Sequence, residues 1–440
     1  MLWVSLAAWI WMFFEPSVLA GETVSRARSR MIGRILRDPF AWFLLVASLF
    51  ALARWLNSGV RLFFDAEKSV WSVREATVAM LPASSGDAGF LPFVTVAVAA
   101  TVIVGARHAI GRNARIWFGV VSGAFSAIGG LAAAVSVAFG ADTFRESALA
   151  GFGVPFFAGS FFAFALPVAI ACGIEAEERG MTKARLLFAL AVTGNAVGAF
   201  VFLPTVLGMV YLSVSVAVAI AALALCKRRQ GAAACARAAS MLALGIVGAA
   251  SVVLVPSYKD VVQRKFSEVA VEKAFPPALS DRNEALRRIS FSMWKECQWG
   301  GVGVGAFKLQ APFHVSKEDW AVLPPRPELG PNGYFTLLAE RGIVGSIFWF
   351  AGIAFLLSSW VVRLVGSVRW HNAQEEGRAW VFCMPVTAWA GVAVLALALV
   401  DAWFSSGFLL TPLSVCVASA MSLAASSFPK MKKRMNEEKD

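Results

Sequence analysis

The sequence predicts an all-α polytopic integral membrane protein with about 11 transmembrane helices and one long periplasmic loop between helices 8 and 9. Hydrophobic residues make up 58% of the 440 residues and charged residues only 15%, a balance that soluble domains seldom have. Apolar stretches of bilayer-spanning length recur along the chain. Lysine and arginine gather in alternate connectors, which is the pattern expected when those connectors lie in the cytoplasm.

The expected spans follow one another with short connectors, apart from one long hydrophilic segment after the eighth span. Residues 1–256 are expected to hold helices 1–8, residues 257–333 the periplasmic loop, residues 334–427 helices 9–11, and residues 428–440 a basic cytoplasmic tail. The stretch at 58–89 is amphipathic with mixed charge and is expected to lie in the membrane interface, on the side away from the cytoplasm. The predicted spans are 2–20, 39–57, 90–106, 116–138, 153–172, 185–203, 205–226, 238–256, 334–361, 379–400 and 405–427.

Charge distribution sets the expected orientation. Five arginines follow the first span, at positions 26, 28, 30, 34 and 37, whereas a cleavable secretory signal carries its charge in front of the apolar stretch. Placing this connector in the cytoplasm puts the other basic connectors and the tail there too, and leaves few basic residues in the short outer connectors at 58–89 and 139–152. The prediction is a multi-pass protein with a periplasmic N-terminus and a cytoplasmic C-terminus.

Composition also bounds the chemistry. The formal net charge of +12 is explained by cytoplasmic connectors, so nucleic acid is not an expected partner. The six cysteines are scattered and imply no disulfide framework. His108, His314 and His371 lack metal-ligand spacing, and the chain has no phosphate-binding loop or dinucleotide motif. No cofactor and no metal are expected.

The sequence centres on residues 330–349, where the long hydrophilic segment meets an apolar helix. Asn332, Thr336 and Glu340 recur at four-residue steps and would form one polar stripe on a helix that Asn332 caps. An acidic residue at the mouth of a membrane helix is costly unless it faces protein, ions or water. Gly342 and Gly345 remove bulk one turn later and favour close contact with a neighbouring helix.

The hydrophilic segment carries three further features. Residues 282–296 have helical spacing with a basic face that includes Arg287 and Arg288. The sequence WGGVGVGAF at 299–307 follows, and its four glycines allow tight backbone approach. His314 is the only histidine expected outside the membrane. A loop of this length is more often functional than not.

These motifs resemble a known family. Arg288, Trp294, the glycine-rich turn and then PNGYFTLLAERGIVG at 331–345 are similar to the C-terminal signature of the O-antigen ligase and O-antigen polymerase superfamily of polytopic membrane glycosyltransferases. That signature has an arginine-led helix, a glycine-rich turn ending in phenylalanine, and His-Asn-x-Tyr-Leu-x-x-Leu-x-Glu-x-Gly-x-x-Gly. RESALAGFGVP at 145–155 is weakly similar to an upstream Arg-Ser-Gly segment of the family.

The chain also departs from the family pattern. Pro331 stands where the family usually has the loop histidine thought to activate the acceptor, and Phe156 stands where the upstream asparagine would be. The Ser-Arg pair at the outer end of a middle helix would fall near Leu207 and Gly208 and is absent. The chain therefore resembles a divergent member of the family.

The resemblance implies transfer of a glycan from a polyprenyl diphosphate carrier to a sugar or lipid-linked acceptor at the bacterial inner membrane, in cell-surface polysaccharide biosynthesis. Expected partners are therefore the polyprenyl-diphosphate-linked glycan, the acceptor glycan or glycolipid, and membrane lipid. Arginine suits a leaving diphosphate because its planar fork binds phosphate oxygens bidentately. The predicted catalytic residues are Arg288, His314 and Glu340, with Arg145, Arg287, Asn332 and Tyr334 as substrate-binding residues.

Two other functions remain open at this point. One is a non-catalytic membrane scaffold that binds a lipid-linked glycan or a partner enzyme, which the missing histidine favours. The other is a polysaccharide transporter or flippase. The predicted spans are poor in buried charge, with Asp401 as the main exception, and they lack paired broken helices, which disfavours transport.

Overall fold

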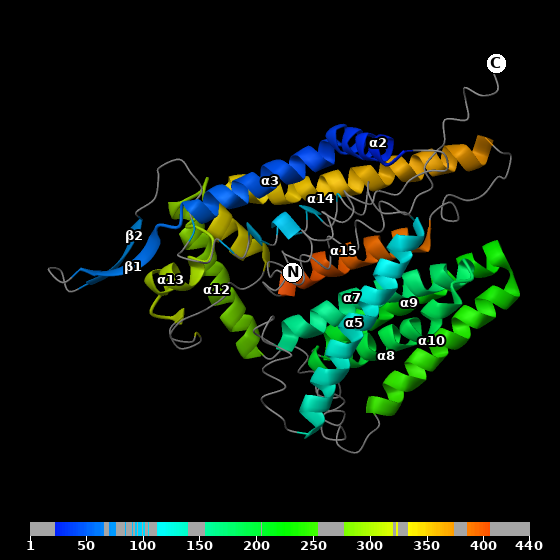
Figure 1. The fold of residues 1–440 in the computed structure, drawn as a ribbon. Helices are drawn as coiled ribbons and strands as arrows, with labels where there is room; N and C mark the ends of the chain where they lie inside the picture. Colours follow the sequence, from blue (N-terminus) through cyan, green and yellow to red (C-terminus); the bar gives the residue numbers. More distant parts are fainter. Residues whose placement is uncertain are drawn as a thin grey trace.

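The computed structural model describes residues 23–65, 70–75, 84, 112–139, 155–203, 205–253, 277–319, 323, 333–373 and 385–404, with isolated positions between 90 and 104. Within these residues the protein is almost entirely helical (Figure 1). Five helices are long and apolar enough to cross a membrane, or up to six if one bent helix pair counts as a span. The chain is therefore a multi-pass membrane protein in its described part.

Helices occupy the predicted spans wherever those spans are described as continuous elements. The predicted spans 2–20 and 405–427 lie outside the described residues, and 90–106 is described only at isolated positions. The total of 11 spans, the domain boundaries and the periplasmic position of the loop therefore stay predictions. The helices in the remaining spans are α3 (Pro39–Leu56), α5 (Arg112–Phe139), α7 (Pro155–Glu178), α8 (Arg185–Phe202), α9 (Thr205–Gln230), α10 (Ala232–Val253), α14 (Gly333–Ala373) and α15 (Val386–Phe404).

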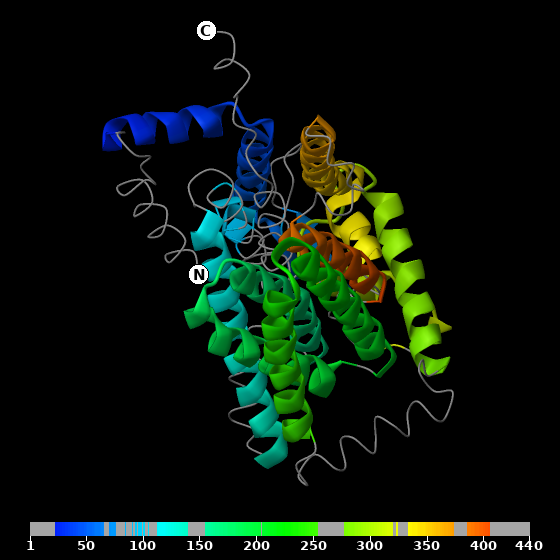
Figure 2. The ribbon, with the colours of Figure 1, turned by 90° about the vertical axis from the view of Figure 1, so that its right-hand side faces the viewer.

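Helix α7 lies at the centre of a bundle with α5, α8, α9 and α10 (Figure 2). Most of its residues from Gly159 to Glu178 are buried, as in a helix at the core of a large membrane domain. Helix α15 packs on α7 and α9 and also contacts α14, which runs beside α3. Figure 1 shows α15 between the α7–α10 bundle and the α3–α14 pair, so α15 joins the two parts of the molecule.

Helix α3 packs against α14 through aromatic side chains and small residues. Phe43 lies 6.3 Å from Phe348 and 5.2 Å from Phe355 between ring centroids. Gly352 leaves room for Phe43, since a Cβ atom on it would lie 3.1 Å from that ring. Before α3 the short helix α2 (Val24–Leu36) bends away by 71°, and it carries four of the five arginines that the sequence places in the cytoplasm.

One described segment departs from the expected all-helical fold. Strands β1 (Val60–Asp65) and β2 (Val70–Glu75) form an antiparallel hairpin directly after α3. RLFFD and VWSVR are rich in aromatic and β-branched residues, which favour strands. An amphipathic stretch was expected here from the sequence, and the strands were not predicted. Figure 1 shows the hairpin projecting beyond the end of α3, near α12 (Pro277–Glu296) and α13 (Phe307–Gln310).

Charged side chains are buried at both ends of α7, and one of them is Asp401, the exception that the sequence indicated. Asp401 on α15 is fully buried, and its Oδ1 accepts hydrogen bonds from Ser160 (2.7 Å) and Tyr211 (2.9 Å). At the other end of α7, the buried carboxylate of Glu177 pairs with Arg185 at 2.6 Å. These contacts connect α7 with α8, α9 and α15, so the buried charges hold the bundle together.

Candidate functional site

The candidate site is built around a break in α14 at Gly342. This residue has φ 61° and ψ −166° inside an otherwise helical segment. Only glycine adopts that backbone region without strain, because a Cβ atom would clash with the neighbouring peptide groups. About 20 apolar residues span a bilayer, and the apolar run of α14 that follows, 343–362, has that length. The break therefore lies at the mouth of the span.

The glycine-rich turn fills this break with backbone hydrogen bonds. In an uninterrupted α-helix the N–H groups of residues 343 and 344 would donate to the carbonyls of residues 339 and 340. Here Ile343 N donates to Gln298 O (2.9 Å) and Val344 N to Trp299 O (3.2 Å). In return, the carbonyls of residues 339 and 340 accept from the N–H groups of residues 302 and 303, at 2.9 and 3.1 Å. Four hydrogen bonds thus join two segments about 40 residues apart.

Glu340 adds a side-chain clamp to the same contact. Its Oε1 accepts hydrogen bonds from Gly305 N (3.0 Å) and Phe307 N (3.4 Å), and the residue is only 9% exposed. A carboxylate is a strong acceptor for these amide groups, because hydrogen bonds to a charged group are stronger than those between neutral groups. The structure therefore places Glu340 where it holds the turn and the start of α13.

The close approach predicted from the glycines is confirmed. A Cβ atom on Gly301 would lie 2.5 Å from Arg341 N, and one on Gly342 would lie 2.5 Å from Gly301 N. Gly301 itself has a positive φ of 69°. The partner of Gly342 is the glycine-rich turn, whereas the sequence suggested a neighbouring helix. Gly345 does face a helix, because Arg54 of α3 packs beside it.

Helix α12 is packed onto this unit by an apolar cluster. Buried side chains of α12, of the turn, of α13 and of α14 meet in one core, which includes Ile289, Met293, Val302, Phe307 and Ala339. The helical spacing predicted for residues 282–296 is thus confirmed by α12. Because its apolar face is buried, the opposite face presents the polar residues of α12.

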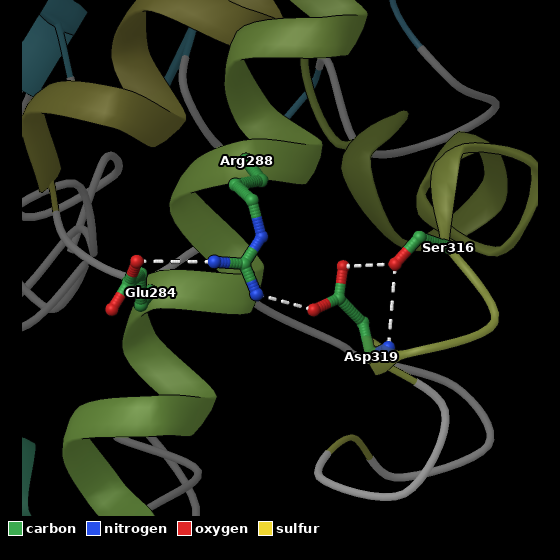
Figure 3. A network of polar contacts seen from close by, with 4 residues as sticks. All are labelled: Glu284, Arg288, Ser316 and Asp319. Atoms are coloured by element: carbon green, nitrogen blue, oxygen red, sulfur yellow. Dashed lines mark hydrogen bonds and ion pairs between the residues drawn. The ribbon is translucent and has the colours of Figure 1, made fainter.

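Arg288 lies on that exposed face and is held by two carboxylates (Figure 3). Its Nη1 donates to Glu284 at 3.1 Å, and its Nη2 donates to Asp319 at 2.5 Å. Asp319 also accepts from Ser316 Oγ at 2.7 Å, and its side chain is 5% exposed, whereas that of Arg288 is 56% exposed. The hydrogen bond from Arg288 lowers the pKa of the Asp319 carboxyl, and the same bond raises the pKa of Arg288. Both groups are therefore charged at neutral pH.

His314 lies further along the same side of α12 as Arg288, in the short 3₁₀ turn Ala311–His314. Its Nδ1 is 3.0 Å from Ser292 Oγ and its Nε2 is 3.7 Å from Glu296, while its side chain is 8% exposed. Ser292 and Glu296 are one turn apart on α12. This arrangement fixes the imidazole ring between α12 and the turn.

The remaining predicted residues divide into described and undescribed ones. Tyr334 donates its hydroxyl to Leu399 O at 2.8 Å and stacks on Phe350, so it connects α14 with α15. Arg287 is half-buried on α12. Arg145 and Asn332 lie outside the described residues. Helix α14 begins at Gly333, which agrees with the helix start expected after Asn332.

The structure thus joins Glu340 to the glycine-rich turn and Arg288 to Asp319. Among the residues that the structure describes, no hydrogen bond or ion pair links Arg288 or His314 directly with Glu340. Three charged residues of this region were missed by the sequence reading: Asp319, Arg54 and Arg341. Arg54 had a usable signal, since an arginine inside an apolar span is rarely without function.

The fold and the site define a class of protein. It is a multi-pass helical membrane protein in which a hydrophilic segment is hydrogen-bonded into a break in a membrane helix. Residues 186–350 match the family model described as O-antigen ligase. The matched range runs from α8 to the middle of α14 and contains α12, the glycine-rich turn and the break at Gly342. The resemblance to the O-antigen ligase and polymerase superfamily is therefore confirmed. A comparison with curated proteins gave no match.

Proposed function

We propose that this chain is a bacterial inner-membrane glycosyltransferase of the O-antigen ligase and polymerase type. It would move a glycan from a polyprenyl diphosphate to a hydroxyl group of a sugar or lipid-linked acceptor. The observation that carries the proposal is the set of four backbone hydrogen bonds between residues 298–303 and 339–344, which we call the interlock at Gly342. It joins the two motifs of the resemblance inside the matched O-antigen ligase domain. The orientation with this site in the periplasm belongs to the same proposal, on the basis of the basic connectors.

The proposed reaction forms a bond between the acceptor oxygen and the anomeric carbon while the bond to the diphosphate oxygen breaks. The diphosphate leaves with the electron pair, and arginine neutralises its charge without a metal. Arg288 suits this role because Glu284 and Asp319 fix its guanidinium while more than half of its side chain stays exposed. Arg145 and Arg287 are proposed to assist in donor binding, with Asn332 and Tyr334 near the sugar.

The acceptor proton needs a base, and His314 is the proposed one. Its Nδ1 is engaged with Ser292, so Nε2, on the side of Glu296, is the nitrogen left to take a proton. The side chain of Glu296 is 64% exposed and that of His314 is 8% exposed, so the acceptor is proposed to approach this nitrogen from the side of Glu296. We propose that Glu340 acts on the position of the glycine-rich turn, because both amide contacts of its Oε1 go to that segment.

The test is a gene deletion with complementation. Surface glycans of the deletion strain are profiled by gel electrophoresis and mass spectrometry, and the strain is complemented with wild type, Arg288→Ala, His314→Ala and Lys308→Ala. Lys308 is an exposed cation on α13 and serves as the matched control. Membrane levels of each variant are measured in the same cells.

The proposal expects that deletion removes polymerised or lipid-attached glycan, that Lys308→Ala restores it, and that Arg288→Ala does not. Failure of His314→Ala as well identifies that histidine as the base. If deletion leaves every glycan unchanged, or if Arg288→Ala and His314→Ala complement fully, the enzyme assignment is wrong. The second candidate, a non-catalytic binder of lipid-linked glycan, then takes its place, and Pro331 at the position of the family histidine favours it.

A further inference from the structure

Arg54 and Arg341, which the sequence analysis did not single out, lie beside the break in α14. Arg54 comes from the last turn of α3 and Arg341 from the residue before Gly342. Arg54 is 5% exposed. The Nε atoms of both residues are buried and lack a hydrogen-bond partner among the described residues. Buried guanidinium groups normally have such partners, because an unpaired charge in a protein interior is costly.

The side chains of Arg54 and Arg341 both lie against Gly345 of α14. A Cβ atom there would lie 2.5 Å from Arg341 Cβ and 3.0 Å from Nη2 of Arg54, so only glycine leaves space for both. The Arg54 guanidinium also lies 4.8 Å from the ring centroid of Phe50, which orients it by a cation–π contact. The two charges are close enough to repel each other.

The charges of Arg54, Arg341 and Glu340 do not balance. Glu340 is the one acidic side chain that acts on both arginines, and it forms no ion pair within 4 Å with either of them among the described contacts. Its Oε1 is already used by the amides of Gly305 and Phe307. Among the described residues, two guanidiniums and one carboxylate leave a net positive charge at the mouth of a membrane span. An anion of matching shape would complete it.

We propose that Arg54 and Arg341 form a binding site for the diphosphate group of a lipid-linked substrate. Guanidinium forks match phosphate oxygens in geometry and charge, and the position at the end of α3 and at the break of α14 suits a head group whose lipid tail lies in the bilayer. The proposal rests on the proposed function and deepens it. It adds Arg54 and Arg341 to Arg288, which lies 53 positions before Arg341 in the sequence, as residues that would contact the donor diphosphate.

A purely structural role for the two arginines makes a different prediction. Arg54 lies near the C-terminus of α3, where a cation interacts favourably with the helix dipole. Removing the charge would then lower the stability of the ligand-free protein and leave ligand affinity unchanged. Ligand binding and ligand-free stability are therefore measured on the same variants.

The experiment uses the full-length protein in detergent and isothermal titration calorimetry. Farnesyl diphosphate is the probe, farnesol reports binding of the lipid tail alone, and inorganic pyrophosphate reports binding of a free anion. The variants are Arg54→Gln, Arg341→Gln, the charge-retaining Arg54→Lys, and Lys308→Gln as the matched control. Melting temperatures without ligand and elution profiles show whether each variant is folded.

We expect farnesyl diphosphate to bind at least tenfold more tightly than farnesol. Each glutamine variant should weaken that binding by about 10- to 100-fold, as expected for loss of hydrogen bonds to a charged group. Arg54→Lys should fold like the wild type and bind with intermediate affinity, and Lys308→Gln should bind normally. Pyrophosphate binding that exceeds farnesyl diphosphate binding would show a site for free phosphate and would overturn the assignment to a lipid carrier.

Equal affinity of the wild type and both glutamine variants also overturns the inference, as does absence of farnesyl diphosphate binding to the wild type. If the glutamine variants do not fold, the comparison of Arg54→Lys with the wild type decides, since lysine keeps the charge and loses the fork. Glycan transfer in the complemented deletion strain is an independent readout. Transfer that depends on Arg288 with no binding defect in the Arg54 and Arg341 variants rejects this site and leaves the proposed function standing.

Discussion

Replacing Gly342 by alanine tests whether the glycine-rich turn and the broken helix form one unit. The new methyl group would lie 2.5 Å from the nitrogen of Gly301 and still closer to the carbonyl oxygen of Trp299. Both contacts are with backbone, so neither can be relieved by a change of rotamer. Alanine at φ 61° and ψ −166° is also strained by itself. The turn must therefore move away from α14 or the helix must straighten.

The cost has two components. Backbone strain of this kind costs about 1–3 kcal/mol. Separation of the two segments breaks the four backbone hydrogen bonds between residues 298–303 and 339–344, at about 1 kcal/mol of net stability each. The sum is about 5–7 kcal/mol, which is comparable to the whole stability of many domains. We therefore expect local opening of the interlock, and at physiological temperature loss of the folded structure of residues 277–319.

Hydrogen exchange followed by mass spectrometry measures this opening at the segments concerned. The amides of Val302, Gly303, Ile343 and Val344 donate the four hydrogen bonds, and peptides covering 298–307 and 339–345 contain them. Destabilisation of the closed state by about 5–7 kcal/mol accelerates exchange by more than about 1,000-fold, since each 1.4 kcal/mol is a factor of ten. Peptides from α7 should exchange as in the wild type, because α7 lies in the bundle.

Gly180→Ala is the matched control for strain. Gly180 has a similar φ of 67°, and nothing lies within 4 Å of a Cβ atom built there. The Gly180→Ala variant should be destabilised by backbone strain alone. It should leave exchange at 298–307 unchanged. Equal exchange of these peptides in Gly342→Ala and wild type, with both proteins folded, would refute the interlock as the reason for glycine at this position.

Three further predictions concern the carboxylates. Glu340→Ala removes the acceptor for two loop amides and should accelerate exchange at 305–307, with Glu340→Gln, which keeps an acceptor oxygen, less affected. The depressed pKa of Asp319 means that its contact with Arg288 stabilises the protein above the unfolded pKa of about 3.9 and is lost as pH falls further. The difference in melting temperature between wild type and Asp319→Asn should therefore stay constant near neutral pH and vanish in acid below that value. Asp401→Ala leaves two buried hydroxyl groups without their acceptor and should destabilise the bundle by about 1–3 kcal/mol for each group, measured as thermal unfolding in detergent against Asp401→Asn.

Much of the helical architecture could be predicted from sequence because bilayer thickness sets the length of each apolar segment. Residues 205–226, for example, became α9, which is lengthened only by its basic last turn. The hairpin at 60–75 escaped prediction because its mixture of apolar and charged residues is also compatible with an amphipathic stretch. Strand pairing depends on a partner, and no local pattern in this segment identified one.

The break in α14 could not be predicted, for a different physical reason. A glycine inside a helical pattern costs only about 1 kcal/mol relative to alanine and is commonly tolerated. The positive φ of Gly342 is imposed by hydrogen bonds to residues 298 and 299, which are remote in sequence. Periodicity correctly brought Thr336 and Glu340 to one buried face, and it gave no information on what that face contacts.

This architecture determines how mutations of the site must be interpreted. Glu340 and Gly342 both hold the glycine-rich turn against α14, so loss of activity in either variant reports loss of that contact and identifies no group that touches substrate. Arg288 and Arg54 are more informative because neither forms part of those hydrogen bonds. A variant of either arginine that keeps normal hydrogen exchange at 298–307 and loses glycan transfer would separate chemistry from folding. The pair Arg288→Gln and Arg54→Gln, measured with that exchange control, thus distinguishes a binding role from support of the fold.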